Sequence, residues 1–455
     1  MINNLLPEIK HIIRLAVPLF ITQLIAALMM FTDTVIASRA SHIDMAAVSI
    51  ATGLWYPVIF TAQGLMISVT PVVAQLFGSS KTHTENNAEM VSTVYQGGYL
   101  AVIATIFIVG LYQLVDIPVA ALNLEPELNE KTLGYLGYVI IGVLPTILFF
   151  ALRGFCEGVG LTKPALVVSA IAVIANVPLN YIFVFGYFGM PELGGAGCGL
   201  ATAIVQWLSF ISLLIYFSVS KKLKPYQLFS HAQKPRWQSI NNLIRIGTPI
   251  AFSVFFETTL FACMSLFIAP LGAIAVAGHQ VAYSYSAVVF MAPLSLAMAA
   301  TIRVGYLKGA QDWVQLRRCI KACFSLAVVF GTLVMLTTYT MKDHIIALYT
   351  DEPSVVALAA SILVITAIYQ LPDAFQVMSA SIFKGLKVTK PLFYITFIAY
   401  WPIGFALGYV LGRTDYIVPA MGAQGFWAGV VVGLTCASLM FIVTLRKTMQ
   451  RFPRH

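Results

Sequence analysis

Charged residues are scarce in this 455-residue chain: Asp, Glu, Lys and Arg together make up 10% of it. A soluble domain typically contains roughly 25%. Hydrophobic residues make up 59% of the chain, which excludes an ordinary soluble domain and indicates a polytopic membrane protein. The apolar runs are much longer than a barrel strand of about 9 to 11 residues, so we predict an all-α integral membrane protein.

Cysteine and histidine are also few, which limits the chemistry available. The six cysteines show no metal-ligand spacing, and we expect small core residues rather than a disulfide framework. Of the seven histidines only His279 lies near the membrane interior, and neither HExxH nor GxSxG occurs. An intramembrane hydrolase would need a nucleophile with a base, or a metal cluster. We therefore expect no enzyme activity and no cofactor.

Apolar length and loop punctuation predict twelve transmembrane helices, six on each side of a basic stretch. They are expected near residues 11–37, 45–75, 92–115, 133–154, 163–188, 196–219, 243–269, 274–302, 317–340, 355–381, 390–412 and 423–446. The boundaries predict an N-lobe at residues 1–220, a cytoplasmic linker at 221–242 and a C-lobe at 243–455.

The two halves repeat each other in sequence. RLAVP at 14–18 recurs as RIGTP at 245–249, and TPVVAQLFG from Thr70 as TIRVGYLKG from Thr301, both at an offset of 231. Later, TKP at 162–164 recurs at 389–391, an offset of 227. Six spans is an even number, so both copies insert the same way up. The repeat predicts two lobes related by pseudo-two-fold symmetry along the membrane normal.

The distribution of Lys and Arg predicts the orientation. If both termini lie on one side, that side takes all but four of the 27 basic residues. The exceptions are Arg39, Lys131, Lys342 and Arg413. Basic loops face the cytoplasm, so both termini are expected there. The formal net charge of +9 then belongs to inner loops and does not indicate a nucleic-acid partner.

Three acids lie inside predicted spans: Asp33, Glu257 and Asp373. An ionised carboxylate in hydrocarbon costs at least about 2.5 to 3.5 kcal/mol, so such acids usually face a cavity, a partner or an ion. The sequence offers no intramembrane Lys or Arg to neutralise them, and we expect each to hold a proton or a cation from solution. The alternatives are an interfacial position for Asp33 and structural hydrogen bonds for Glu257 and Asp373.

Polar residues on the fifth and sixth spans are candidate partners of Asp33. Asn176 and Asn180 are four residues apart and would share one face of a regular helix, with Pro178 between them. Together with Thr202 they would place oxygen atoms beside Asp33; interhelical hydrogen bonding alone is the alternative. Oxygen ligands make Na⁺ possible at this site, whereas a desolvated carboxyl group suits H⁺. The sequence does not separate the two ions.

The second half offers candidates for a cavity near Glu257 and Asp373. Gln280 opens the eighth span and is favoured over His279, because a lone His is more often a core or cap residue. Aromatic residues also gather there, and their faces attract organic cations. They are Phe255, Phe256, Phe261, Phe290, Tyr369 and Phe375. Packing and lipid-facing roles are the alternative for each ring.

Several longer segments match a known family almost from end to end. They include FTDTVIA around Asp33, NVPLNYIFVFG from Asn176, PELGGAGCGLATAIV from Pro191, FFETTLFA around Glu257 and YQLPDAFQV around Asp373. Together with twelve spans in two repeats, they resemble the multidrug and toxic compound extrusion (MATE) transporters, specifically the NorM-like branch. The chain departs from some archaeal relatives in having Asn180 where they have Asp, so the resemblance does not imply a proton-only mechanism.

This resemblance implies export of amphiphilic, often cationic drugs, driven by cations that enter down their gradient while the lobes alternate in access. It also implies roles for individual residues. The coupling acids of the family correspond to Asp33, Glu257 and Asp373. The polar positions around the first acid correspond to Asn176, Asn180 and Thr202. Positions near the other two acids correspond to Gln280 and Tyr369. Pro18 matches a proline at which the first span of relatives is proposed to bend, about 22 Å along the helix from Asp33.

We therefore expect a cation-coupled multidrug efflux antiporter whose partners are small organic cations and the lipid bilayer, acting as a monomer. The alternative is a lipid-linked oligosaccharide flippase of the same superfamily. Such a flippase would need a strongly basic cavity to hold phosphates. The cavity predicted here is acidic.

Overall fold

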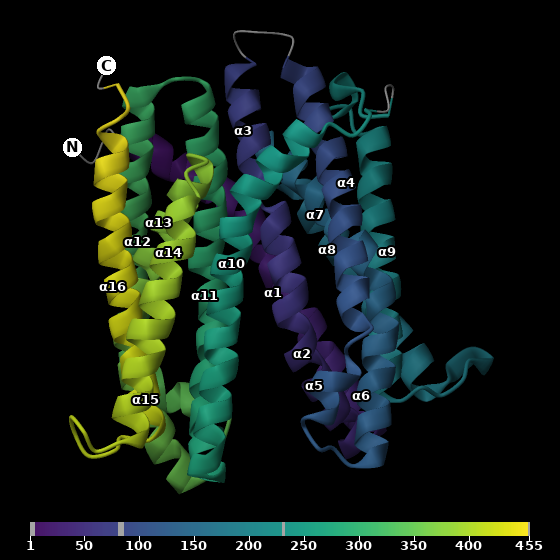
Figure 1. The fold of residues 1–455 in the computed structure, drawn as a ribbon, viewed down its shortest axis with the longest axis vertical. Coiled ribbons are helices and arrows are strands. Elements are labelled where there is room, and N and C mark those ends of the chain that lie inside the picture. The colour runs from purple at the N-terminus through teal and green to yellow at the C-terminus, as the bar shows by residue number, and fades with distance from the viewer. Residues whose placement is uncertain (1–4, 81–85, 230–232, 454–455) are drawn as a thin grey trace. The chain divides into compact units, whose positions relative to one another are not determined.

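A computed structural model of the protein describes residues 5–80, 86–229 and 233–453 (Figure 1). Within these ranges the regular structure is entirely helical, without strands. Twelve stretches are long and apolar enough to cross a membrane. The prediction of an all-helical protein with twelve spans is therefore confirmed.

Some spans are single helices and others are interrupted by short breaks. In the first half the helices are α1 (Leu6–Ala40), α2 (His42–Met66), α3 (Val69–Ser79), α4 (Asn86–Tyr112), α5 (Asp116–Ala120), α6 (Pro126–Val139), α7 (Val143–Gly158), α8 (Lys163–Phe185) and α9 (Gly195–Val219). In the second they are α10 (Trp237–Ile268), α11 (Ala273–Gly309), α12 (Trp313–Ala347), α13 (Pro353–Gly385), α14 (Lys390–Ile398), α15 (Ala406–Arg413) and α16 (Ala423–Met449).

Each predicted span coincides with one of the twelve observed stretches, and most observed helices extend further at both ends. The fifth is the exception at its C-terminal end, because α8 stops at Phe185, three residues before the predicted end. Gly186 adopts φ +71°, a left-handed conformation that glycine tolerates best and that terminates a helix.

The chain packs as two compact units, and the boundary between them does not simply divide the sequence at its middle. One unit is Ile21–Ala251; the other comprises the chain up to Phe20 and from Phe252 onward. Consequently α1 and α10 each begin in one unit and end in the other. The boundary between the units follows the second residue after Pro18 in α1 and the second residue after Pro249 in α10. The lobe limits at residues 220 and 243 stay a prediction.

Within the unit Ile21–Ala251, α9 packs against α6, α7 and α8, and α2 packs against α6. Within the other unit α13 is the central helix and packs against α11, α12 and α16 (Figure 1). The central helices carry or face the polar residues singled out above. Burial of these side chains therefore follows from their place inside a bundle.

The repeat is visible in local backbone geometry. α8 and α14 both follow a Thr with φ −89°, Thr162 and Thr389, and both have Pro in the first turn. α14 then passes into a π-helix, Ala399–Phe405, which α8 lacks. A π-turn holds one extra residue. This extra residue accounts for the change in offset between the two repeats, which is 227 before the π-helix and 228 at the next matched pair, Gly194 and Gly422.

Candidate functional site

Asp33 on α1 meets α8 and α9 within one unit. Its Oδ1 accepts hydrogen bonds from Asn176 Nδ2 at 3.0 Å and Asn180 Nδ2 at 2.7 Å. Its Oδ2 accepts one from Thr202 Oγ1 at 3.1 Å. The structure thus brings together the four residues of the predicted first-lobe site. Pro178 does not move Asn176 and Asn180 off a shared face of α8.

The Asp33 site is buried and rich in oxygen. Asp33 is 8% exposed, and Asn176 and Asn180 are fully buried. The amide oxygens of both Asn residues have no hydrogen-bond partner among the described residues. In that same part of the chain no basic side chain pairs with Asp33. A carboxylate beside two uncommitted amide oxygens is a donor set that suits a hard cation or a proton.

The second candidate site lies around Asp373 on α13. Asp373 is 3% exposed, and its Oδ2 has no partner among the described residues. The preceding Pro372 carbonyl accepts a hydrogen bond from Ser438 Oγ on α16 at 2.6 Å. A buried carboxylate oxygen without a donor is costly and calls for a proton, water or ion. This acid differs from Asp33, whose two oxygens both accept hydrogen bonds.

Other polar atoms near Asp373 are equally unpartnered. They lie at intervals of three residues along α13. The atoms are Gln370 Nε2, Gln376 Oε1 and Ser379 Oγ, each buried and without a hydrogen bond within the described chain. Side chains three residues apart on a helix are neighbours. These groups therefore form a continuous polar row on either side of Asp373.

Glu257 on α10 is half-buried and forms no hydrogen bond or ion pair with the described residues. It lies close enough to Asp373 for the two charges to interact. It also interacts with the charge of Lys384, near the end of α13. The sequence predicts no basic residue near these acids. Lys384 is an exception because α13 continues as a helix to Gly385, although it forms no ion pair with Glu257.

The neighbouring residues His279 and Gln280 have different environments. His279 is 1% exposed; its Nε2 lies 2.8 Å from Ser265 Oγ, and its Nδ1 accepts a hydrogen bond from Trp427 Nε1 at 3.2 Å. Gln280 is exposed, and its Nε2 donates to Ser284 Oγ at 3.2 Å. His279 is thus a hydrogen-bonded core residue, and the contribution of Gln280 to a cavity stays a prediction.

The aromatic candidates also have distinct environments. Phe256 is buried within a cluster of rings, with centroids 5.4 Å from Phe393 and 5.2 Å from Phe397. Tyr369 is 4% exposed and lies edge-on to Trp427 at 6.2 Å. Phe290 is half-buried on α11. Packing explains the position of Phe256 and Tyr369 in this structure, and contact with a drug stays a prediction for all three.

Sequence reasoning missed some residues of both sites. Cys198 on α9 donates its thiol to the backbone oxygen of Asp33 at 3.6 Å. Gln376 and Ser379 extend the polar row beyond Asp373. A signal was present for these two, because polar residues recur every three positions from Gln370 onward. No comparable signal indicates Cys198, since its contact depends on the packing of α9 against α1.

Twelve helical spans in a duplicated chain, with buried acids inside each half, define the class of polytopic transporters built from internal repeats. A family model described as MatE matches residues 18–182 and 249–410. The chain belongs to the MatE family.

Relatives and solved structures match nearly the whole chain. The sequence is 42% identical over 444 residues to the multidrug resistance protein NorM of Photobacterium profundum, covering 98% of this chain and 96% of that protein. The fold resembles the eukaryotic MATE transporter AtDTX14, with a TM-score of 0.87, 17% identity and coverage of 99% and 100%. A Vibrio cholerae MATE transporter, VcmN, gives a TM-score of 0.86 at 18% identity, with 98% of each chain covered.

Proposed function

We propose that the protein is a multidrug efflux antiporter of the bacterial inner membrane, with both termini in the cytoplasm. It exchanges amphiphilic, often cationic drugs for Na⁺ or H⁺ by alternating access. Membership of the MatE family and the full-length likeness to a multidrug resistance protein support drug export. The drug crosses unchanged, so no catalytic step is required, and one chain suffices as the transporting unit.

One observation supports cation coupling above all: buried carboxylates next to uncommitted oxygen atoms. Asp33 lies beside the free amide oxygens of Asn176 and Asn180, and Asp373 Oδ2 has no donor within the described chain. Protein donors alone do not satisfy these groups. A proton or cation at each site would do so, and its release would change the charge of a buried site by one unit.

The proposed coupling residues form two separate cation or proton sites. Asp33, with Asn176, Asn180 and Thr202, forms the first cation or proton site. Glu257 and Asp373 form the second, where Gln280, Tyr369, Phe256 and Phe290 are assigned to the drug cavity. Pro18 is the position at which α1 can bend.

Transport in proteoliposomes tests this proposal. Purified protein is reconstituted, and ethidium transport is measured with an imposed Na⁺ gradient at equal pH, and separately with a pH gradient without Na⁺. We expect one gradient to drive transport, and Asp33→Asn and Asp373→Asn each to reduce it to the level of protein-free liposomes. The control is Asp351→Asn, an exposed acid outside the helices, which should retain transport.

The result identifies the coupling ion as well as the residues. Undiminished transport by both Asn variants would remove the assigned roles of Asp33 and Asp373. Absence of a response to either gradient in the unmodified protein would overturn cation coupling itself.

A further inference from the structure

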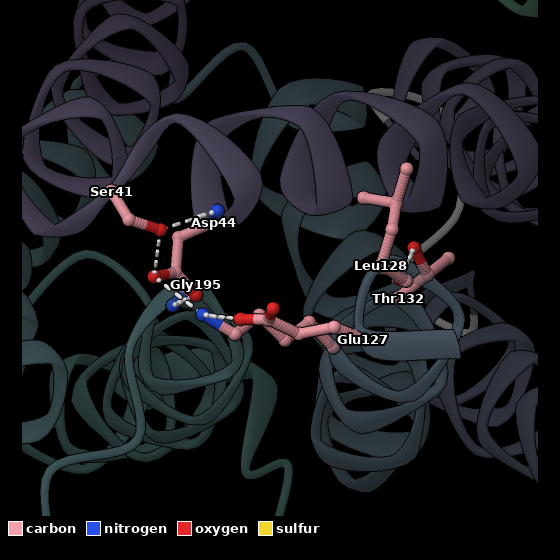
Figure 2. Close-up of polar contacts among 7 residues, drawn as sticks. Ser41, Asp44, Glu127, Leu128, Thr132 and Gly195 are labelled. Atoms are coloured by element: carbon pink, nitrogen blue, oxygen red, sulfur yellow. Dashed lines mark hydrogen bonds and ion pairs between the residues drawn. The ribbon is translucent and has the colours of Figure 1, made fainter. Parts of the chain in front are cut away.

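Another buried carboxylate, Asp44 in the first turn of α2, joins three helices of one unit (Figure 2). It is 3% exposed. Its Oδ1 accepts a hydrogen bond from the backbone N–H of Gly195 at 2.7 Å. Its Oδ2 accepts from Ser41 Oγ at 2.6 Å and from Lys131 Nζ at 3.0 Å. Asp44 thereby connects the α1–α2 turn, α6 and the first residue of α9.

The basic partner is itself shared. Lys131 also forms an ion pair with Glu127 at 3.4 Å, one turn earlier on α6, and its side chain is 29% exposed. Figure 2 labels Asp44 and Glu127, the two acids with which this lysine forms ion pairs. Three donors, one of them the Lys131 ammonium group, stabilise the ionised form of Asp44. A transported cation would have to compete with Lys131 for this carboxylate, so we look for a role that Asp44 exerts through its neighbours.

Two of the elements that Asp44 joins, the end of α1 and the start of α9, belong to helices that also carry residues of the Asp33 site. Asp33 lies on α1, seven residues before Ala40, the last residue of that helix. Thr202 lies seven residues after Gly195, about 10 Å along α9. Two contacts connect the helices there, from Thr202 Oγ1 to Asp33 Oδ2 at 3.1 Å and from Cys198 Sγ to the Asp33 carbonyl at 3.6 Å. A shift of α9 along α1 would break both.

Two glycines permit this close approach. A Cβ atom at Gly194 would lie 2.6 Å from Asp44 Oδ1, and one at Gly195 would lie 2.8 Å from the Asp44 carbonyl oxygen. Gly194 also has φ +56°, a conformation that disfavours other residues. The backbone N–H of Gly195 therefore reaches the carboxylate only because both positions lack a side chain.

The second repeat shows that the turn does not need the carboxylate. Gly422 precedes α16 with φ 61° and ψ −137°, nearly the values of Gly194 before α9, 56° and −139°. The backbone hydrogen bonds are also equivalent. They run from Leu193 N to Phe183 O and Gly194 N to Val184 O in the first half, and from Met421 N to Leu411 O and Gly422 N to Gly412 O in the second.

The residues around that second turn are apolar where the first half is polar. At the offset of 231 the counterpart of Asp44 is Ala275, and that of Asp33 is Met264. At the offset of 228 the counterparts of Asn180 and Thr202 are Gly408 and Val430. Asp44 and the Asp33 site are thus present together in one half and absent together in the other, while the turn forms in both.

We propose that Asp44 is a positioning residue for the Asp33 site: it fixes α9 against the end of α1, so that Thr202 reaches Asp33. This inference rests on the proposed coupling role of Asp33. Loss of Asp44 should weaken the interaction of that site with the coupling cation and leave the drug site in the other unit unchanged.

The variants separate the contact of Asp44 with the Gly195 N–H from its ion pair with Lys131. Asp44→Ala removes both the cap of α9 and the ion pair. Asp44→Asn keeps an acceptor for Gly195 N–H but loses the charge, and Lys131→Met loses the ion pair but keeps the cap. The matched control is Asp312→Ala, which removes another helix-capping carboxylate, on α12, whose Oδ1 accepts from Gln315 N at 2.9 Å.

The first readout is cation-driven ethidium transport in proteoliposomes. A hydrogen bond to a charged group is worth enough to change an equilibrium by about tenfold or more. We expect Asp44→Ala to raise the half-saturating concentration of the coupling cation by about tenfold, and the other two Asp44-site variants to raise it less. The KM for ethidium should be unchanged. Asp312→Ala should lower thermal stability without altering the cation dependence.

The second readout does not depend on transport. With Cys198 as the single cysteine, its alkylation by a membrane-permeant maleimide reports how tightly α9 packs on Asp33. We expect several-fold faster alkylation in Asp44→Ala and no acceleration in Asp312→Ala.

The two readouts distinguish failure of this inference from failure of the proposed function. Unchanged cation dependence and unchanged alkylation in Asp44→Ala, or in Asp44→Asn if the Ala variant does not fold, would overturn the positioning role. If neither gradient drives ethidium transport by the unmodified protein, the proposed function fails. The alkylation rates alone then decide whether Asp44 positions α9.

Discussion

At the scale of single residues, Asp33 and Asp373 differ in the hydrogen bonds that the protein offers to their carboxylates. Asp33 accepts three side-chain hydrogen bonds, from Asn176, Asn180 and Thr202. Asp373 Oδ2 accepts none from the described residues. Donors stabilise the ionised form, and their absence favours a bound proton or cation. The two halves thus offer unlike environments to the coupling ion, although both derive from one repeated sequence.

His279 illustrates a polar residue whose role is structural. We expect His279→Ala to destabilise the protein by about 1 to 3 kcal/mol, because the buried Trp427 Nε1–H then loses its acceptor. Chemical unfolding in mixed micelles measures the change. Gln280→Ala, on the exposed neighbour, serves as the control and should change stability by less than about 0.5 kcal/mol. Equal effects of the two substitutions would contradict the structural role of His279.

At the scale of helices, two rows of glycine face each other between the α14–α15 span and α16. They are Gly404, Gly408 and Gly412 on one side and Gly425, Gly429 and Gly433 on the other. A Cβ atom at Gly429 would collide with the backbone of Gly404 and Gly408. Small residues at four-residue spacing allow helix backbones to approach closely in membranes. The spacing is visible in the sequence, but which two rows meet is decided by packing.

We expect Gly429→Ala to destabilise the protein by about 1 to 3 kcal/mol, since the added methyl group forces α15 and α16 apart. Gly110→Ala is the matched control, because a Cβ atom there meets nothing within 4 Å. It should be neutral or slightly stabilising, as alanine favours helix. The same unfolding measurement applies. A neutral Gly429→Ala would mean that the two helices can separate without cost.

The position of the π-helix in the α14–α15 span is a feature that the sequence does not predict. Ala399–Phe405 contains the one extra residue by which the second repeat shifts from an offset of 227 to 228. The sequence carries that residue, yet apolar periodicity does not reveal where the helix absorbs it. Only the backbone places it beside Pro402, which cannot donate a helical hydrogen bond.

At the scale of the whole molecule, α1 and α10 belong to both packing units. The start of α1 is fixed within its unit by a bidentate ion pair. Glu8, 6% exposed, accepts from Arg303 Nε at 2.8 Å and from Arg303 Nη2 at 2.7 Å. Further along the same helix, Asp33 belongs to the other unit, and Pro18 lies between Glu8 and Asp33.

Breaking this ion pair should be costly. We expect Glu8→Ala to destabilise the protein by roughly 3 kcal/mol, because it leaves the guanidinium of Arg303, whose side chain is 13% exposed, without a counter-charge. A double-mutant cycle with Arg303→Ala isolates the coupling energy. Asp343→Ala breaks the exposed pair with Lys342 and should cost less than about 1 kcal/mol. A Glu8–Arg303 coupling energy no larger than that of the Lys342–Asp343 pair would contradict a stabilising role for the ion pair at the start of α1.

The sequence by itself determined the helical class, the twelve spans, the duplication and the three acids inside the spans, because apolar length and internal offsets are properties of the linear chain. It also predicted that Asn176, Asn180 and Thr202 could face Asp33. Only the tertiary structure decided that they do, that Asp44 ties α9 to the end of α1, and that α1 is shared between two packing units. Those relations depend on which helix faces lie against each other, and helix periodicity fixes a face without fixing its partner.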